Sequence, residues 1–168
     1  MSAEEAARSI QVVLRLCEHW PTLSREDFRK LLADDCIYTD MPLPSQVAVG
    51  PDAAFKKLGV LRNDWVIENE IVNTVGNGRT VMVERVETGR SLAGIIEDWR
   101  VPCVGVFEIE GGKIKTWRDY WNFADVEPLM RLAAIGHSSG LDAATGFFYG
   151  AAVWVEVADR SASATTRR

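Results

Sequence analysis

Three ionisable side chains in the second half of the sequence have the types and spacing needed for acid–base chemistry. Asp119 stands between Trp117 and Trp121 on one face of an expected strand, because alternate residues of a strand share a face. A carboxylate on an apolar face is costly unless it is paired or neutral, and Arg85 with Glu87 on another strand offers such a pair. We expect Asp119 to act as a base, Glu87 as an acid and Arg85 to hold the two carboxyl groups apart. A purely structural buried ion pair, or plain cross-strand charges on the surface, would give the same pattern.

Tyr38 and Asp40 share one face of an earlier short strand, and we expect them to line the same pocket. The aromatic and aliphatic side chains that share a face with the charged ones would bind an apolar small-molecule substrate. These expected substrate-binding residues are Trp117, Trp121, Phe123 and Val83.

The elements that must position these residues follow an α+β order. Apolar residues at helical spacing predict a helix over residues 3–20, a second helix that begins at Ser24 with a capping box to Asp27, and a third that opens at Gly50-Pro51. Alternating patterns predict strands over residues 36–41, from 65 onward, and over 80–88, 99–109 and 114–123, with a closing helix over 125–135. This order predicts a curved antiparallel sheet with N-terminal helices that form a cone with an internal pocket.

Composition limits the class of protein and its partners. The 168 residues suit a single domain, which we place at residues 1–157. The net charge of −5 argues against a nucleic acid or a membrane surface as partner, since phosphate contacts need clustered Lys and Arg. Neither a membrane span nor a signal peptide is indicated, so we expect a cytoplasmic protein. Three widely spaced cysteines predict reduced, buried thiols, and two isolated histidines predict no metal site; we expect no cofactor.

The last part of the sequence leaves alternatives open. Residues 143–157 are apolar but too short to span a bilayer, and they fit an extra strand, a helix over the pocket mouth or a dimer contact. Residues 158–168 are small and polar and predict a disordered tail. The run Gly136-His137-Ser138-Ser139-Gly140 matches the Gly-x-Ser-x-Gly pattern, but a nucleophile elbow needs a strand before it and a helix after it. Here it follows an expected helix, which predicts a helix-ending loop.

The motifs occur in an order that resembles one known family. The run Tyr38-Thr39-Asp40-Met41-Pro42-Leu43-Pro44 is followed by Glu84-Arg85-Val86-Glu87, then by Gly105-Val106-Phe107, and then by Trp117-Arg118-Asp119-Tyr120. This series resembles the limonene-1,2-epoxide hydrolase family, within the larger group that has the nuclear transport factor 2 or ketosteroid-isomerase-like cone. The resemblance implies hydrolysis of an epoxide in one step, without a metal or a covalent intermediate.

The resemblance also implies roles for single residues. In that family an Asp, a Tyr and an Asn hold the attacking water, a second Asp protonates the epoxide oxygen, and an Arg bridges the two acids. Asp119 is similar to the base, Tyr38 to the water-positioning tyrosine and Arg85 to the bridging arginine. Two positions depart, because Asp40 stands where the family has Asn and Glu87 where it has the acidic Asp. Glu87 is one methylene longer, and Asp40 adds a carboxylate that either shares the base role or keeps Asp119 protonated.

Three functions follow from this pocket. The first is an epoxide hydrolase that acts on a hydrophobic cyclic or terpenoid epoxide. The second is an isomerase, dehydratase or ring-rearranging enzyme that uses the same carboxyl groups for proton transfer at carbon. The third is a non-catalytic cone that binds a small molecule. Fold analogy alone does not choose among them. We also expect a homodimer, because sheets of this kind often bury their outer face against a second copy.

Overall fold

The structure is a computed structural model that describes residues 2–92 and 98–126. Three helices are present in this part of the chain: α1 (Ala3–His19), α2 (Arg25–Leu31) and α3 (Pro51–Asp64). Six strands accompany them: β1 (Leu32–Asp40), β2 (Val47–Val49), β3 (Trp65–Gly76), β4 (Thr80–Ser91), β5 (Trp99–Glu110) and β6 (Lys113–Trp121). The α+β class is confirmed.

The helices begin where the sequence predicts. Ser24 caps α2, and the predicted capping box is present, because the Asp27 backbone N–H donates to the Ser24 hydroxyl and the Ser24 N–H donates to the Asp27 carboxylate. Ser2 and Glu5 form a second box at the start of α1. Gly50 is the N-cap of α3, with Pro51 in the first turn.

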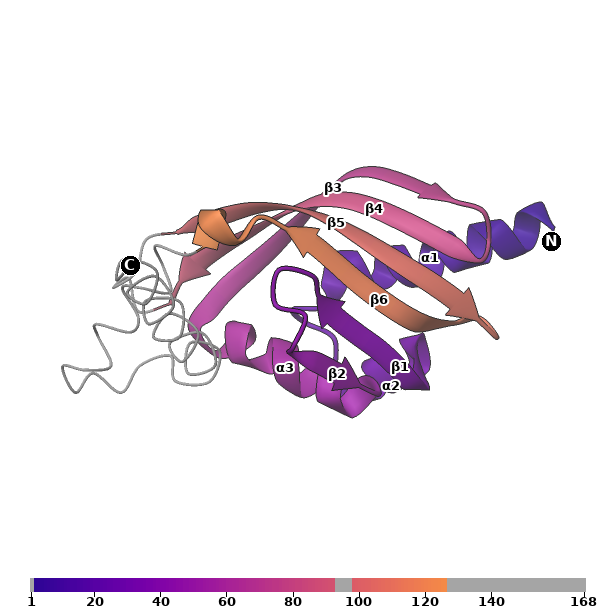
Figure 1. Cartoon of the computed structure of the whole chain (residues 1–168), viewed down its shortest axis with the longest axis horizontal. Helices are drawn as coiled ribbons and strands as arrows, with labels where there is room; N and C mark the ends of the chain where they lie inside the picture. The colour runs from indigo at the N-terminus through magenta and orange to yellow at the C-terminus, as the bar shows by residue number, and fades with distance from the viewer. Residues whose placement is uncertain (1, 93–97, 127–168) are drawn as a thin grey trace, which may run out of the picture.

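The six strands form one curved sheet in the order β2-β1-β6-β5-β4-β3 (Figure 1). Neighbouring strands run antiparallel except β1 and β6, which pair in parallel. The predicted antiparallel pairing therefore holds for every neighbouring pair except β1 and β6, and β2 was not predicted. The alternation of side chains shows which residues share a face, but it carries no information on the direction of a neighbouring strand. Strand β6, the last strand of the described residues, lies in the middle of the sheet between β5 and the early strand β1.

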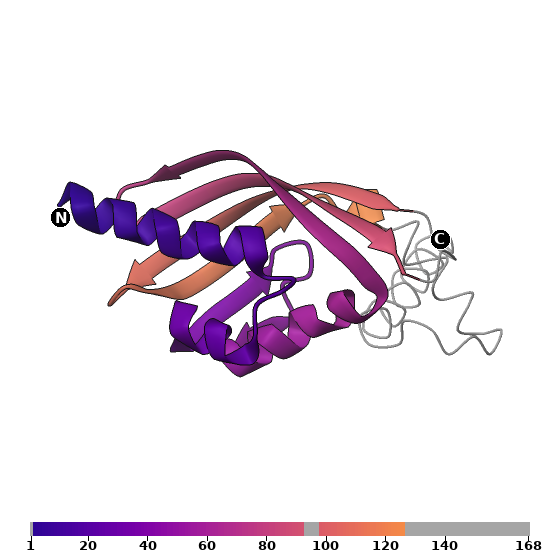
Figure 2. The ribbon, with the colours of Figure 1, turned by 180° about the vertical axis from the view of Figure 1, so that it is seen from behind.

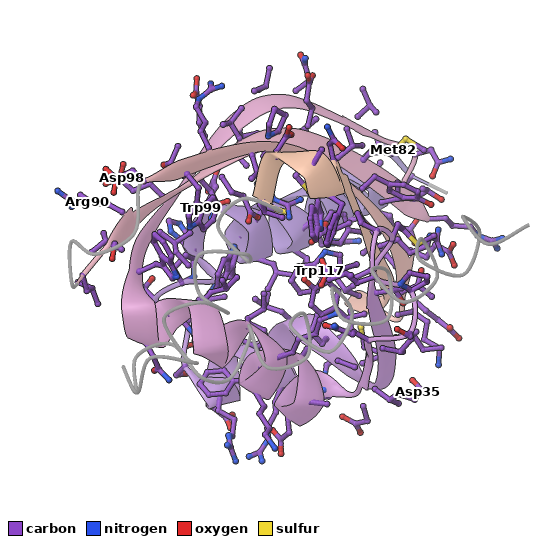
Figure 3. All side chains as sticks on the ribbon, turned by 60° about the vertical axis from the view of Figure 1, so that its left-hand side comes forward. Asp35, Met82, Arg90, Asp98, Trp99 and Trp117 are labelled. Carbon is purple, nitrogen blue, oxygen red and sulfur yellow. The ribbon has the colours of Figure 1, made fainter. Side chains whose placement is uncertain are left out.

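All three helices lie on the concave side of the sheet (Figures 1 and 2). Helix α1 crosses β3 and β4, whereas α3 touches β1 and β2 at one edge of the sheet and β3 at the other. The helices and the sheet therefore surround an interior, as the view in Figure 3 shows. In that view Trp99 and Trp117 point inward, while Met82, Arg90 and Asp35 point away. The core includes Val13, Leu16 and Trp20 from α1, Phe28 from α2, and Val81, Phe107, Ile114 and Trp117 from the sheet.

Several predicted boundaries shift. Strand β1 begins at Leu32 rather than Cys36, and β6 ends at Trp121, so Phe123 lies in a helical turn of residues 123–126 instead of the strand. The rest of the predicted closing helix, the apolar segment 143–157, the Gly-x-Ser-x-Gly run and the expected tail lie outside the described residues. None of the helices in the described part of the chain is long and apolar enough to cross a membrane.

Candidate active site

Arg85 and Asp119 form the charged centre of the site. They lie on β4 and β6, and β5 runs between these two strands. The Arg85 guanidinium donates two parallel hydrogen bonds to the Asp119 carboxylate, from Nη1 to Oδ1 at 3.1 Å and from Nη2 to Oδ2 at 2.9 Å. Both side chains are buried. The guanidinium can cross β5 because Gly105 pairs with Asp119 in the sheet and has no side chain to occupy that space.

The same arginine also holds the second acid. Its Nε donates to Oε1 of Glu87 at 2.8 Å, and the Glu87 side chain is only 16% exposed. Burial alone would lower the pKa of Arg85, but the carboxylates of Asp119 and Glu87 outweigh it and raise that pKa well above its ordinary value. Arg85 is therefore a permanent cation that touches both carboxyl groups, as the sequence predicts.

Asp119 has the chemical character of a base that works near neutral pH. Burial raises its pKa from the ordinary 3.8 to about 6, against the opposing effect of Arg85 and with smaller contributions from Asp40 and Glu87 in the same direction as burial. A group with this pKa is mostly ionised at pH 7 and still accepts a proton far more readily than an exposed aspartate. The charge of Asp40 thus raises the pKa of Asp119, which is the direction expected from the sequence.

Tyr38 and Asp40 lie beside this centre because β1 runs parallel to β6. The register pairs Tyr38 with Trp117 and Asp40 with Asp119. The Tyr38 ring stacks on Trp117 with 3.9 Å between ring centroids, and its hydroxyl donates to Oδ1 of Asp40 at 3.1 Å. Trp121 Nε1 donates to the same oxygen at 3.2 Å. The five residues with expected catalytic roles therefore meet at one place.

Lys57 was missed by the sequence reasoning. It comes from α3, and its Nζ lies 2.8 Å from Oδ2 of Asp40. The signal that would have found it is its spacing, because Lys57 follows the buried Ala54 by three residues and precedes the buried Leu58, on the helix face turned toward the sheet. A lysine on the inner face of a helix needs a buried partner, and Asp40 is that partner.

These residues line one wall of a pocket with a volume of about 80 Å³, which is room for several water molecules. Its lining includes Trp117 and Trp121, as predicted, and also Trp20, Trp65 and Trp99, which were missed. Strand alternation would have placed Trp99 on the inner face with Val101. Val83 and Phe123 do not line the pocket: Val83 is fully buried in the core, and Phe123 stacks against Trp121 beyond the end of β6.

The amide of Asn69, next to Glu87 in the sheet, has no hydrogen-bond partner among the described residues. Asn69 of β3 pairs with Glu87 across the sheet, and both polar atoms of its amide are buried without a hydrogen bond to any described residue. The inward direction follows from the alternation Trp65, Ile67, Asn69, which sequence reasoning did not use.

The described residues contain no cluster of three or more His, Cys, Asp or Glu that would hold a metal ion. The three cysteines are buried and unpaired, as predicted. Burial raises the pKa of Cys17 and Cys36 to about 12, so neither thiol is a nucleophile at neutral pH.

Comparisons with known proteins concern the family and the fold of this chain. The profile of the limonene-1,2-epoxide hydrolase catalytic domain matches residues 5–131. A limonene-1,2-epoxide hydrolase-like epoxide hydrolase of M. tuberculosis is 22% identical with a TM-score of 0.63, over 78% of this chain and 96% of that one. A putative SnoaL-like polyketide cyclase from a Jannaschia species is 20% identical with a TM-score of 0.65, over 76% of this chain and 94% of that one. A Catenulispora acidiphila protein with a ketosteroid isomerase-like fold is 19% identical with a TM-score of 0.61, over 69% of this chain and 88% of that one.

At these identities the solved structures establish the shared cone fold, whereas the family profile reaches further. It spans most of the sequence and includes all five predicted catalytic residues as well as Lys57. The protein therefore belongs to the limonene-1,2-epoxide hydrolase catalytic-domain family.

Proposed function

We propose that the protein is a cofactor-independent epoxide hydrolase that adds water to a hydrophobic epoxide, cyclic or terpenoid-like, by concerted acid–base catalysis. The observation that carries this proposal is one buried arginine bonded to two carboxyl groups on the wall of a tryptophan-lined pocket. Family membership supports it. A pKa of about 6 gives Asp119 the strength that a general base needs near neutral pH.

In the proposed reaction, Asp119 removes a proton from a water molecule while the water oxygen attacks one epoxide carbon. The bond from that carbon to the epoxide oxygen breaks, and the oxygen takes a proton from the protonated carboxyl group of Glu87. The product is a vicinal diol. Asp119 is then protonated and Glu87 ionised. Before the next turnover Asp119 releases its proton to solvent and Glu87 takes one up, so both groups return to their starting states.

Arg85 suits this reaction because negative charge passes from Asp119 to Glu87 during the step. A cation that is bonded to both groups stabilises the charge wherever it lies, and it needs no rearrangement to do so. Tyr38 and Asp40 would hold the water. Asp40 pairs with Asp119 in the register of β1 and β6, and its carboxylate can accept a hydrogen bond from the water molecule. The extra methylene of Glu87 is compatible with this scheme, because Glu87 still reaches Arg85 Nε at 2.8 Å.

The test is hydrolysis of a panel of cyclic and terpenoid epoxides in ¹⁸O-labelled water, with detection of the diol by mass spectrometry. We expect one labelled oxygen per diol and a loss of at least about 100-fold in kcat/KM for both Asp119→Asn and Glu87→Gln. Glu84→Gln is the matched control, because Glu84 lies on the same strand as Glu87 but faces outward. If Asp119→Asn and Glu87→Gln both hydrolyse epoxides as well as the control does, the assignment is wrong.

A second function, proton transfer at carbon in an isomerase or dehydratase, is favoured by one observation. Asp40 supplies a carboxylate where the family has an amide, so the pocket holds three carboxyl groups rather than two. The same labelling experiment separates the two reactions. A product without solvent oxygen, formed at a rate that depends on Asp119, would select the isomerase, and binding without any turnover would select the non-catalytic cone.

A further inference from the structure

The charged side chains of the pocket fall into two separate arrays. Asp119, Arg85 and Glu87 form the first, in which one cation serves two carboxyl groups. Asp40 and Lys57 form the second, in which one cation serves one carboxylate. The two arrays meet where Asp40 pairs with Asp119 across β1 and β6, so the charge of one array acts on the other at close range.

The Lys57 ammonium group has contacts on three sides. It lies 2.8 Å from Oδ2 of Asp40, donates to the backbone carbonyl of Gln46 at 2.6 Å, and sits over the Tyr38 ring at 4.3 Å from the centroid. The ammonium group therefore contacts a carboxylate, a carbonyl oxygen and an aromatic face, and these contacts place Lys57 to hold Asp40.

Asp40 is held from several sides in turn. Oδ1 accepts from the Tyr38 hydroxyl and from Trp121 Nε1, and Oδ2 forms an ion pair with the Lys57 ammonium group. This leaves the carboxylate in one orientation, with its charge balanced by a cation. An asparagine at this position would carry no charge and would need no such cation. We therefore treat Asp40 and Lys57 as one functional pair.

The groups that act on Asp119 come from every element packed around it. They are Arg85 and Glu87 from β4, Tyr38 and Asp40 from β1, Cys103 from β5, Cys17 from α1 and, through Asp40, Lys57 from α3. With Glu87 protonated, as the proposed reaction requires, the carboxylates of Asp40 and Asp119 and the cations Arg85 and Lys57 give this set a net charge of zero. Without Lys57 the charge would be −1, and Asp40 would repel the negative charge on Asp119 without compensation.

We propose that Lys57 is a positioning residue that acts through Asp40: it holds Asp40 as an oriented acceptor for the attacking water and cancels the charge of Asp40 at Asp119, so that Asp119 stays ionised and able to act as a base. The role in holding water rests on the proposed hydrolysis. The effect of Lys57 on the ionisation of Asp119 does not depend on the reaction.

The proposal predicts opposite effects for the two halves of the pair. Lys57→Met leaves the Asp40 charge uncompensated and raises the pKa of Asp119. Asp40→Asn leaves the Lys57 charge uncompensated and lowers the pKa of Asp119. We expect a change of about one pKa unit in each direction, which is the lower end of the range for a charge within 4–6 Å. The double variant Asp40→Asn/Lys57→Met removes both charges and returns the pKa close to that of the wild type.

The experiment is a ¹³C NMR titration of protein labelled at the aspartate carboxyl carbons, with Asp119 assigned by its loss in Asp119→Asn. It needs no substrate, so it gives a result even if the protein hydrolyses no epoxide. Opposite changes in the two single variants and recovery in the double variant are expected. The proposal is overturned if both single variants move the pKa in the same direction or if neither moves it.

Further variants separate the effect of charge from damage to the fold. Lys57→Arg keeps the charge and is expected to keep the wild-type pKa, which a purely steric role would not predict. If Lys57→Met fails to fold, the comparison of Asp40→Asn with the double variant decides, because the proposal requires the pKa to be lower in Asp40→Asn. If an epoxide is turned over, the low-pH limb of kcat/KM must follow the NMR values. Hydrolysis without that agreement would refute the role of Lys57 and leave the proposed function standing.

Discussion

Gly105 is the residue whose replacement tests the geometry of the site most directly. It lies in β5 between Val83 of β4 and Asp119 of β6. A Cβ at this position would lie 2.8 Å from Arg85 Nη1 and 2.5 Å from Cε2 of Phe107. Nη1 is the atom that donates to Oδ1 of Asp119 at 3.1 Å. Gly105→Ala therefore pushes directly on the hydrogen bond that joins the proposed base to its arginine.

The size of the effect follows from these distances. An ordinary contact with a Cβ begins near 3.4 Å, so the guanidinium must retreat by about 0.6 Å, and the bond to Asp119 is stretched beyond a normal length. A misplacement near 1 Å can cost on the order of 100-fold in rate, so we expect kcat/KM to fall by roughly 10- to 100-fold. Overpacking of a filled core costs about 1–3 kcal/mol, and we expect the free energy of unfolding to fall by that amount.

The assay combines diol formation from the best epoxide substrate with urea denaturation. Gly59→Ala is the control, because a Cβ at Gly59 in α3 makes only an ordinary 3.5 Å contact with Arg62. That variant should be as active as the wild type and about 0.5–1 kcal/mol more stable, since alanine is favoured over glycine in a helix. A Gly105→Ala protein with wild-type activity and stability would show that the guanidinium does not need the space above Gly105, and the reasoning would fail.

Four further predictions test other parts of the site. Gly89→Ala should raise KM more than it lowers kcat, because its Cβ would lie 2.2 Å from the Trp99 ring and would push that ring within the pocket; tryptophan fluorescence reports the shift. The kcat/KM profile should fall about tenfold per pH unit below about pH 6, where Asp119 becomes protonated. The same raised pKa predicts a contribution to stability that is complete below about pH 4 and lost as pH rises through about 6, worth roughly 3 kcal/mol and absent from Asp119→Asn in denaturation at each pH. Asn69→Leu should raise the free energy of unfolding by about 1 kcal/mol, since it removes an unbonded buried amide; a loss of stability in urea would show that the amide has a partner.

The sequence contained the information for most of the elements and for the bridging arginine. Capping residues and glycine turns mark where helices and hairpins begin, and these signals act within a few residues. The contact of Arg85 with Asp119 was predictable because a carboxylate on an apolar face needs a partner. Each of these inferences uses either local physics or a single rule about buried charge.

What was not predictable from the sequence is long-range. The parallel pairing of β1 with β6 depends on how the sheet closes around the helices, and no local pattern reports it. Helical spacing would have placed Lys57 on the inner face of α3, but it could not show that Lys57 meets Asp40, because that partner lies on another element. Val83 was assigned to the pocket because it shares a face with Arg85, but the pocket occupies only part of that face. The alternation of side chains along a strand shows which face of the sheet a residue lies on. The position of the residue along the strand decides whether its side chain packs in the core or lines the pocket.

The parallel pairing also explains why the site depends on the register of β1. A shift in register between Leu32 and Ile37 precedes the pairs Tyr38–Trp117 and Asp40–Asp119. A slip of one residue would turn Thr39 inward in place of Tyr38 and Asp40, because strand side chains alternate between faces. Two contacts hold the observed register: the Tyr38 ring stacks on Trp117, and the backbone N–H of Met41 donates to the Asp119 carbonyl at 2.8 Å. The stacked pair of Tyr38 and Trp117 therefore does more than line the pocket, since it keeps Asp40 opposite Asp119.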